Sequence, residues 1–251
     1  MAEFDGRVAL VTGGNRGIGK AVALAFAERG ASVVIAARSE PEGQATVETI
    51  SSGGGEALFV KTDVSEETDV QRMVDRTVET FGRLDYACNN AGMQLTITDL
   101  ATFTEDEWDR TIDVNLKGAW LCMKYEISQM LEQGGGTIVN MASTNGLIGT
   151  AGFAAYTASK HGMLGLTRAA ALEYARSGIR VNALCPGGVH TEMYDDLYPD
   201  PESLQKARDF HPMGRLSAPE EIASAAMWLC SNGSAFIIGH GLTIDGGLTT
   251  R

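Results

Sequence analysis

The sequence predicts a single α/β domain, in which a buried parallel sheet is built from strands that alternate with helices. Short apolar runs of strand length alternate along the chain with longer segments that show helical periodicity and capping residues. The first of these strands also runs directly into a glycine-rich turn and a helix, an arrangement typical of α/β folds. With 251 residues and 44% hydrophobic content, the chain can bury an ample core.

The first strand, Val8–Thr12, is a continuous apolar run that we expect to be buried on both faces. It leads into three glycines with the spacing G-x-x-x-G-x-G, and a helical pattern follows around Val22–Phe26. Glycines allow a tight turn and the close approach of a ligand, and the N-H groups of a helix start favour an anion. The turn therefore predicts a dinucleotide pyrophosphate site, with a purely structural turn as the alternative. Its predicted binding residues are Gly13, Asn15, Arg16, Gly17, Ile18 and Gly19.

The end of the second predicted strand, Ala31–Ala37, bears on which dinucleotide is bound. In such folds an acidic residue at this place hydrogen-bonds the ribose hydroxyls of NAD. Here Ala37 occupies it and Arg38 follows, and a guanidinium can bind a 2′-phosphate. With Arg16 as a second cation, we expect NADP(H) rather than NAD(H), although NAD(H) is possible and Arg38 could instead be a solvated loop residue.

The alternation of elements continues through the middle of the chain. In order, we expect a helix from Ser39 to Ser51–Gly55, a strand at Ala57–Lys61, a helix from Ser65 to Phe81 and a strand at Leu84–Cys88. Asp63 and Val64 follow the third strand, where an adenine would lie. Asn90, Ala91 and Gly92 follow the fourth, where small residues and amides suit close contact with a ligand.

A capping box at Thr104 and Glu107 predicts the start of a long helix that carries Asn115. Asn115 is an amide in an apolar neighbourhood, and one way to satisfy its hydrogen bonds is to hold an ordered water near an active site. A fifth strand, Thr137–Met141, then delivers Ser143 at its carboxyl end.

Tyr156 and Lys160 are four residues apart on a predicted helix that runs to about Arg176, where Gly178 stops it. Residues with this spacing share a helix face, so the phenol and the ammonium can point into one pocket. A nearby cation favours the phenolate and makes the tyrosine a usable acid or base, although two such residues can also meet by chance.

The last part of the chain combines a strand end with a long irregular segment. The sixth strand, Arg180–Cys185, leads to Pro186, Gly187, Val189 and Thr191. Residues 190–215 follow as a predicted lid over the substrate, whose six acids weakly disfavour an acidic substrate. Predicted pocket residues are His190, Tyr194, Asn145 and Phe153; Ser217 with Glu220 should cap the final helix, and Leu242–Asp245 should form the seventh strand.

Composition narrows the partners. A formal net charge of -12 disfavours nucleic acid, and no apolar run is long enough to span a bilayer, so we expect a cytoplasmic protein without a membrane partner. The four cysteines are widely spaced, which predicts neither a zinc site nor disulfides but reduced, buried thiols.

Taken together, these motifs resemble those of the short-chain dehydrogenase/reductase family. They are Thr12-Gly13-x-x-x-Gly17-x-Gly19, Asp63, Asn89-Asn90-Ala91-Gly92, Asn115, Ser143, Tyr156-x-x-x-Lys160 and Pro186-Gly187. The resemblance implies one Rossmann-type doubly wound domain over residues 1–251, with a seven-stranded parallel sheet in the order 3-2-1-4-5-6-7 and three helices on each face. The cofactor half would span about 1–140, and the catalytic residues and lid about 141–251. It also implies a homotetramer or dimer built from the helices of Asn115 and Tyr156.

The resemblance also implies roles for the catalytic residues. Tyr156 would be the general acid or base, Ser143 would polarise the substrate oxygen, and Lys160 would bind the nicotinamide ribose and lower the pKa of Tyr156. Asn115 would hold a water that connects Lys160 to solvent.

The resemblance places the cofactor along the predicted residues as well. The turn around Asn15–Ile18 would bind its phosphates, Arg38 its 2′-phosphate, Asp63 and Val64 its adenine, Asn90 a ribose, and Val189 and Thr191 its carboxamide.

The expected substrate is a small carbonyl compound or secondary alcohol whose identity stays open. An NAD-dependent alcohol or sugar dehydrogenase and a catalytically silent cofactor sensor are the alternatives. A serine hydrolase is disfavoured because no G-x-S-x-G elbow occurs.

Overall fold

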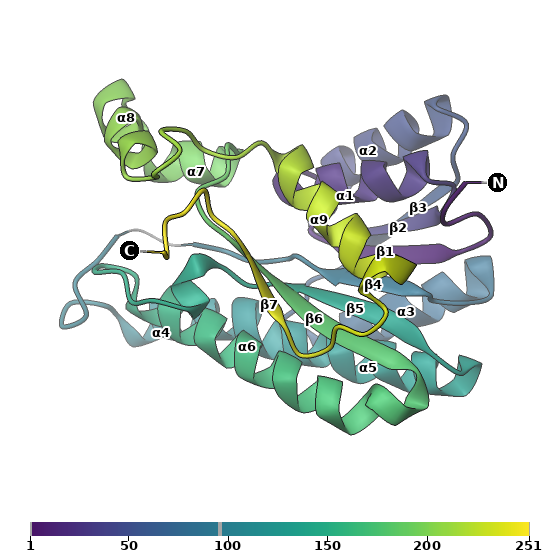
Figure 1. Ribbon diagram of the computed structural model, residues 1–251. Helices are drawn as coiled ribbons and strands as arrows, with labels where there is room; N and C mark the ends of the chain where they lie inside the picture. The colour runs from purple at the N-terminus through teal and green to yellow at the C-terminus, as the bar shows by residue number, and fades with distance from the viewer. Residues whose placement is uncertain (1, 95–96, 251) are drawn as a thin grey trace.

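A computed structural model describes residues 2–94 and 97–250 of the chain. Its strands form a seven-stranded parallel sheet in the order β3-β2-β1-β4-β5-β6-β7, which confirms the predicted fold (Figure 1). The strands are β1 (Val8–Thr12), β2 (Ser32–Ala37), β3 (Ala57–Lys61), β4 (Tyr86–Asn89), β5 (Gly136–Met141), β6 (Ile179–Pro186) and β7 (Gly241–Ile244). Each lies within two residues of its predicted bounds.

The strand order reverses between β1 and β4. Strands β2 and β3 extend the sheet on one side of this point, and β4 to β7 extend it on the other. At the centre of the sheet, Leu10 of β1 lies opposite Val34 of β2 on one side and Ala87 of β4 on the other. In open α/β sheets, ligands bind in the crevice outside the carboxyl ends of the strands at such a point. Several of the predicted site residues follow these strand ends.

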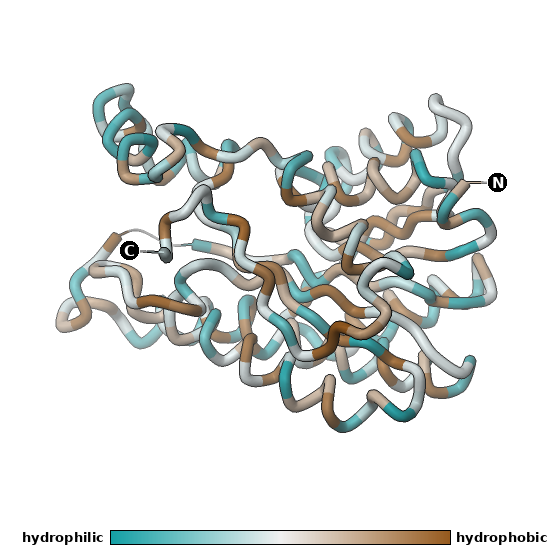
Figure 2. Tube along the Cα trace, viewed as in Figure 1, coloured by the Kyte–Doolittle hydropathy of each residue, from teal (hydrophilic) through white to brown (hydrophobic). Residues whose placement is uncertain are grey.

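Helices cover both faces of the sheet (Figure 1). The helices α1 (Gly17–Glu28), α2 (Glu40–Ser52) and α9 (Pro219–Cys230) lie on one face, and α3 (Glu67–Phe81), α5 (Gly118–Gln133) and α6 (Ala154–Tyr174) lie on the other. Each group packs into its own apolar core against central strands, such as β1 and β2, that are almost wholly inaccessible to water. Figure 2 shows this burial as brown strands at the centre of the molecule.

The long helix predicted from Thr104 is a composite of three helical segments. It consists of α4 (Glu105–Ile112), a π-helical turn at Asp113–Lys117 and α5. The Thr104 capping box is confirmed, because its hydroxyl accepts from the Glu107 N-H while the Glu107 carboxylate accepts from the Thr104 N-H. The π turn, which holds Asn115, was not predicted, and such turns recur at functional sites.

Two predicted helix starts are wrong. The cap of α3 is Glu66 rather than Ser65, because Ser65 instead donates both its N-H and its hydroxyl to Asp63. The cap of α9 is Ala218 rather than Ser217, and Glu221 rather than Glu220 accepts from the cap N-H. Ser65 is thus held by a local bond, whereas the Ser217 N-H and hydroxyl donate to the distant Gly188 carbonyl, and each start lies one residue later than predicted.

The predicted lid contains the two short helices α7 (Glu192–Leu197) and α8 (Pro201–Asp209). They project from the end of the molecule where the carboxyl ends of the strands lie, and α8 is largely hydrophilic (Figures 1 and 2). Among the described residues, no helix has both the length and the apolar character needed to cross a membrane.

Candidate active site

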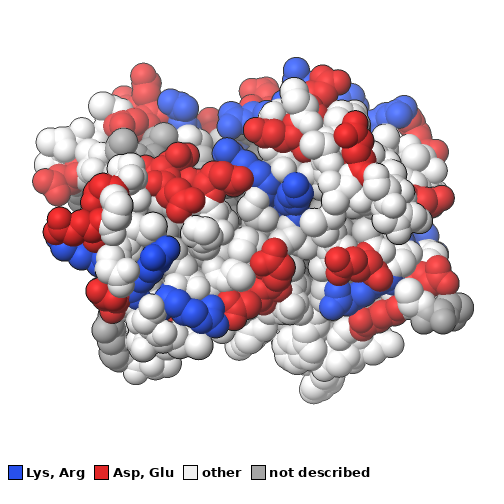
Figure 3. Space-filling model, turned by 90° about the horizontal axis from the view of Figure 1, so that it is seen from above, with Lys and Arg blue, Asp and Glu red and all other residues white. Residues whose placement is uncertain are grey.

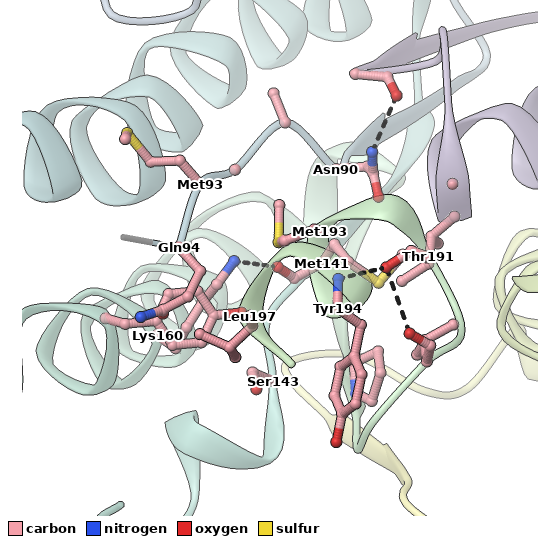
Figure 4. Close-up of a pocket in the computed structure, with 18 of the residues that line it drawn as sticks. Asn90, Met93, Gln94, Met141, Ser143, Lys160, Thr191, Met193, Tyr194 and Leu197 are labelled. Carbon is pink, nitrogen blue, oxygen red and sulfur yellow. Dashed lines mark hydrogen bonds between the residues drawn. The ribbon is translucent and has the colours of Figure 1, made fainter. Parts of the chain in front are cut away.

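Tyr156 and Lys160 lie in the first part of α6 and meet as their spacing predicts. The Lys160 Nζ is 5.4 Å from the centroid of the Tyr156 ring. Lys160 is buried, and its ammonium donates a 2.8 Å hydrogen bond to the Met141 carbonyl at the end of β5 (Figure 4). The strand end thus fixes the cation beside the phenol.

Burial acts on both groups in the direction that favours their neutral forms. It lowers the pKa of Lys160 to about 8. It also raises the pKa of Tyr156, while a hydrogen bond from Ser143 acts to lower it. The expected lowering of the Tyr156 pKa by Lys160 is therefore not found, because burial outweighs the hydrogen bond from Ser143. At neutral pH the site holds a protonated phenol next to an ammonium.

Ser143 follows β5 and caps a short 3₁₀ turn, Thr144–Gly146. Its oxygen accepts a 3.1 Å hydrogen bond from the Asn145 N-H. Because this bond uses a lone pair of the oxygen, the hydroxyl proton is free to donate toward Tyr156 or a substrate oxygen.

Asn115 is completely buried in the π turn, but its amide does not need a water. Its Oδ1 accepts from the Met93 N-H at 2.8 Å, and its Nδ2 donates to the Met93 carbonyl at 2.8 Å. A third contact joins Nδ2 to the Ser159 hydroxyl at 3.4 Å. The amide thus fixes the segment after β4 beside Lys160. That Asn115 also holds a water connecting Lys160 to solvent stays a prediction.

The glycine turn is shaped for close approach, with two glycines in the left-handed region, Gly13 at φ 64° and Gly17 at φ 51°. Gly19 serves a different purpose, because a side chain there would overlap the Gly13 carbonyl oxygen and push α1 off the turn. Asn90, directly after β4, holds the turn in place because its Nδ2 donates hydrogen bonds to the Thr12 and Gly13 carbonyls.

A cleft of about 750 Å³ runs from this turn to Tyr156. It is lined by all the predicted catalytic and cofactor residues except Gly19 and Asn115, which lie behind its wall. The lining includes Gly13, Asn15, Arg16, Gly17, Ile18, Arg38, Asp63, Val64, Asn90, Ala91, Gly92, Ser143, Tyr156, Lys160, Pro186, Gly187, Val189 and Thr191. The fold thus brings six strand ends and α6 into one cavity.

The glycine-turn end of the cleft carries charges of both signs. Arg16 and Arg38 both line it and are exposed, and neither guanidinium group has a hydrogen-bond or ion-pair partner within residues 2–94 and 97–250. Glu42 lines the same end and accepts a 2.7 Å hydrogen bond from Asn15 Nδ2. Sequence reasoning missed Glu42, which lies in the first turn of α2 and belongs to no strand end.

The lid closes the other side of the cleft. Tyr194, together with Asn145 and Phe153, lines the cavity as predicted, whereas His190 points outward and lies 3.8 Å from Asp195 in an exposed pair. His211, which was not predicted, lines the cleft instead and is almost wholly buried.

Both ring nitrogens of His211 are bound to backbone groups. Nε2 accepts a 2.8 Å hydrogen bond from the Gly188 N-H, and Nδ1 lies 2.9 Å from the Ala207 carbonyl. These partners assign the neutral Nδ1-H tautomer. The imidazole therefore fastens the lid to the segment after β6.

A dinucleotide fits these residues. The positive-φ glycines form a cradle that a Cβ would fill, and two unpartnered guanidinium groups match phosphate charge. Asp63 keeps its carboxylate in place by accepting from Ser65. No cluster of three or more metal-ligating side chains occurs in the described part of the chain, and all four cysteines are buried and free, as predicted.

Comparison with known proteins identifies the same fold and site class. Residues 13–249 match the family model described as enoyl-(acyl carrier protein) reductase. An uncharacterized oxidoreductase of Thermotoga maritima is 46% identical over 98% of both chains. Cyclohexanol dehydrogenase of an Acinetobacter species is 40% identical over 99% of this chain and 97% of its own. The crystal structure of levodione reductase superposes with a TM-score of 0.96 at 34% identity, over 99% of both chains.

Proposed function

The chain belongs to the short-chain dehydrogenase/reductase family of oxidoreductases that act on alcohols and ketones, and from this premise we propose that it uses NADP(H), with Tyr156 as the general acid or base. The observation that carries the proposal is the single cleft that joins Tyr156, Ser143 and Lys160 at one end to two unpartnered arginines at the other. When bound, the cofactor supplies a hydride to a ketone or accepts one from an alcohol.

The protein's own residues move and hold the proton. In the reducing direction, the Ser143 hydroxyl donates to the substrate oxygen and Tyr156 gives that oxygen its proton, so that ketone, NADPH and a proton yield a secondary alcohol and NADP⁺. The raised pKa of Tyr156 keeps the phenol protonated and ready to act as an acid at neutral pH. Lys160, as a cation, stabilises the phenolate that remains until solvent returns the proton.

Replacement of Tyr156 by phenylalanine tests the catalytic assignment. We expect Tyr156→Phe to lower kcat by roughly 10²–10⁴-fold, because it removes the proton donor. NADP⁺ affinity, measured by calorimetry, should change by less than about threefold, since the ring and its packing remain. Tyr174→Phe, outside the cleft, is the matched control and should keep full activity. Unchanged turnover in Tyr156→Phe would refute the assignment and support a silent cofactor sensor.

Arg38 carries the preference for NADP(H). Its guanidinium has no partner in the described chain and can form charge-assisted bonds with a 2′-phosphate, typically worth about 1.5–3 kcal/mol. We expect Arg38→Leu to weaken NADP⁺ binding by roughly 10- to 100-fold and to leave NAD⁺ binding within about threefold. Arg76→Leu, on the far surface of α3, is the control and should change neither.

Glu42 supports NAD(H) as the second candidate. Its carboxylate lines the same end of the cleft, where it would repel a 2′-phosphate and could accept a hydrogen bond from a ribose hydroxyl. Parallel titrations of the unaltered protein with NAD⁺ and NADP⁺ decide between the two. Tighter binding of NAD⁺ would overturn the NADP(H) proposal and leave the reaction class intact.

Assembly and location are part of the same proposal. Trp120 and Leu131 on α5 and Leu172 on α6 leave large apolar side chains exposed on the helices expected to form subunit contacts. We infer a homotetramer or dimer, which light scattering of the purified protein measures directly. The four free cysteines favour a reducing compartment such as the cytoplasm.

A further inference from the structure

The part of the cleft in front of Ser143 and Tyr156 has uncharged walls. Ile148 and Phe153 contribute from the loop after β5. Met193, Tyr194 and Leu197 contribute from α7 (Figure 4). Tyr194 also packs on the ring of Tyr198, with centroids 4.9 Å apart. These side chains offer apolar surface and few hydrogen-bonding groups to a substrate.

Charged side chains of the cleft gather elsewhere. Within the described part of the chain, those that line it are Arg16, Arg38, Glu42, Asp63, Lys160 and Glu192. The first four belong to the glycine turn, the ends of β2 and β3 and the start of α2. The Glu192 carboxylate lies about 4.0 Å from where a Cβ on Gly17 would stand, so it also faces the glycine turn.

Lys160 is therefore the cation nearest a substrate, and its ammonium already contacts other groups of the chain. Its ammonium donates to the Met141 carbonyl and lies against Tyr156. A substrate carboxylate that entered between Leu197 and Phe153 would lose its water without gaining an ionic partner, and such burial is strongly unfavourable.

The lid beside the cleft is mainly acidic, which disfavours a phosphate-bearing substrate. Residues 190–215 hold six acids against three bases. The acids are Glu192, Asp195, Asp196, Asp200, Glu202 and Asp209. Figure 3 shows red side chains gathered over the part of this face where the lid helices lie. Substrates attached to coenzyme A or to an acidic carrier protein would meet like charge here.

We propose that the substrate is an uncharged, mainly apolar ketone or secondary alcohol, and that the site discriminates against carboxylates and against thioesters on phosphate-bearing carriers. This inference rests on the proposed function, since it concerns the substrate of the same reaction. The lid supplies the selectivity through apolar contact and the absence of a counter-charge rather than through a dedicated hydrogen bond.

A pair of probes that differ in charge and by one methyl group tests the inference. Methyl 4-oxocyclohexanecarboxylate and 4-oxocyclohexanecarboxylate share the ring and the reacting carbonyl. We expect kcat/KM with NADPH to be at least about 30-fold higher for the ester, because only the acid brings an unpaired charge into the cleft. Equal or faster reduction of the acid would overturn the proposal. Ethyl acetoacetate and acetoacetyl-coenzyme A form the corresponding pair for carriers, with the same expected order.

A cation placed in the lid should reverse part of this preference. Leu197→Arg is expected to narrow the ratio between ester and acid by about tenfold, because the guanidinium can pair with the carboxylate. Leu197→Gln, which adds polarity without charge, is the matched control and should leave the ratio within about threefold. Calorimetric NADP⁺ affinity within threefold of the unaltered protein shows that each variant is folded. An unchanged ratio in Leu197→Arg, or an equal shift in Leu197→Gln, would contradict the charge argument.

Binding separates this inference from the proposed function. If the protein binds NADPH but reduces none of the probes, the proposed reaction is wrong for these ketones. The fluorescence of bound NADPH then reports competition between the ester and the acid for the cleft. Binding of the ester alone supports the uncharged-substrate inference, and binding of the acid with equal or higher affinity overturns it.

Discussion

Lys160 is a residue that the proposed reaction needs but that lowers the stability of the folded chain. It is held as a buried cation, and burial lowers its pKa from 10.5 to about 8. Below pH 8 the folded chain must keep an ammonium out of water, a cost that the single bond to the Met141 carbonyl offsets only in part. Active sites often store such a cost because the charge is needed for the reaction.

Replacing Lys160 by methionine should therefore stabilise the protein while disabling it. The depressed pKa means that the unfolded chain binds more protons between pH 8 and 10.5, so the stability of the unaltered protein rises with pH across that window and is lowest below it. At pH 7 we expect Lys160→Met to raise the free energy of unfolding by roughly 1–3 kcal/mol in urea titrations of the cofactor-free protein. The difference should shrink as pH approaches 10.5.

The matched control is Lys206→Met on the surface of α8. Its ion pair with Glu202 is exposed, so its loss should change stability by less than about 1 kcal/mol. A destabilised Lys160→Met protein at pH 7 would show that the bond to Met141 outweighs the burial of the charge.

At the scale of elements, strands and most helices follow from local pattern, whereas their ends and irregular turns do not. The apolar run Val8–Thr12 was predictable because a short, continuous apolar segment is typical of a strand that is buried on both faces of the sheet. The sequence pattern could not show that Ser65 does not cap α3, because its hydrogen bonds to Asp63 depend on the conformation of the loop after β3. The π turn around Asn115 was not predicted either, and its amide bonds Met93, which lies 22 residues earlier in the chain.

The candidate site shows the same division. The residues on strand ends and on one helix face, such as Ser143 and Tyr156, were predictable because parallel strands end at one edge of the sheet. Glu42 and His211 were not, because helix starts and lid helices take their positions from tertiary packing. His190 was chosen for its place after β6, but the chain turns into α7 there and directs its side chain to solvent.

His211 makes the lid an element with a defined anchor. Its Nε2 accepts from the Gly188 N-H, and the Gly188 carbonyl in turn accepts from the Ser217 N-H. We expect His211→Phe to raise KM for a ketone substrate by about tenfold with a smaller effect on kcat. The reason is that a buried N-H left without a partner costs roughly 1–3 kcal/mol, which opens the lid. Steady-state kinetics and limited proteolysis across residues 190–215 measure the two consequences.

His211→Gln is the control that separates anchoring from general packing. Its Oε1 can take the place of Nε2 and accept from Gly188, so it should restore KM to within about threefold and protect the lid from proteolysis. If the phenylalanine variant kept the original KM, the anchor would have no role in substrate binding.

At the scale of the whole molecule, the core beneath the sheet holds a buried polar network. Glu126 of α5 is inaccessible to water, and its Oε2 accepts a 2.9 Å hydrogen bond from Asn89 Nδ2 at the end of β4. Asn89 also donates to Asn140, which donates to Thr167. Within the described part of the chain, two acceptors of this network have no partner, Glu126 Oε1 and Asn89 Oδ1. A protonated carboxyl that donates from Oε1 to Oδ1 would satisfy both, and burial accordingly raises the pKa of Glu126 to about 8.

This network makes global stability depend on pH in a direction that a glutamine variant can test. The folded chain keeps the Glu126 proton up to about pH 8, whereas the unfolded chain releases it near 4.5, so stability falls as pH rises between these values, by at most about 1.4 kcal/mol per unit. Glu126→Gln has the shape of the protonated acid and no proton to lose. We therefore expect it to remove this slope, to match the unaltered protein near pH 5 and to exceed its stability by roughly 2–4 kcal/mol at pH 8. Urea unfolding at several pH values measures the slope, with Glu132→Gln on the exposed side of α5 as the control. Parallel slopes for Glu126→Gln and the unaltered protein would show that Glu126 is ionised in the core and that the two acceptors find their partners in another way.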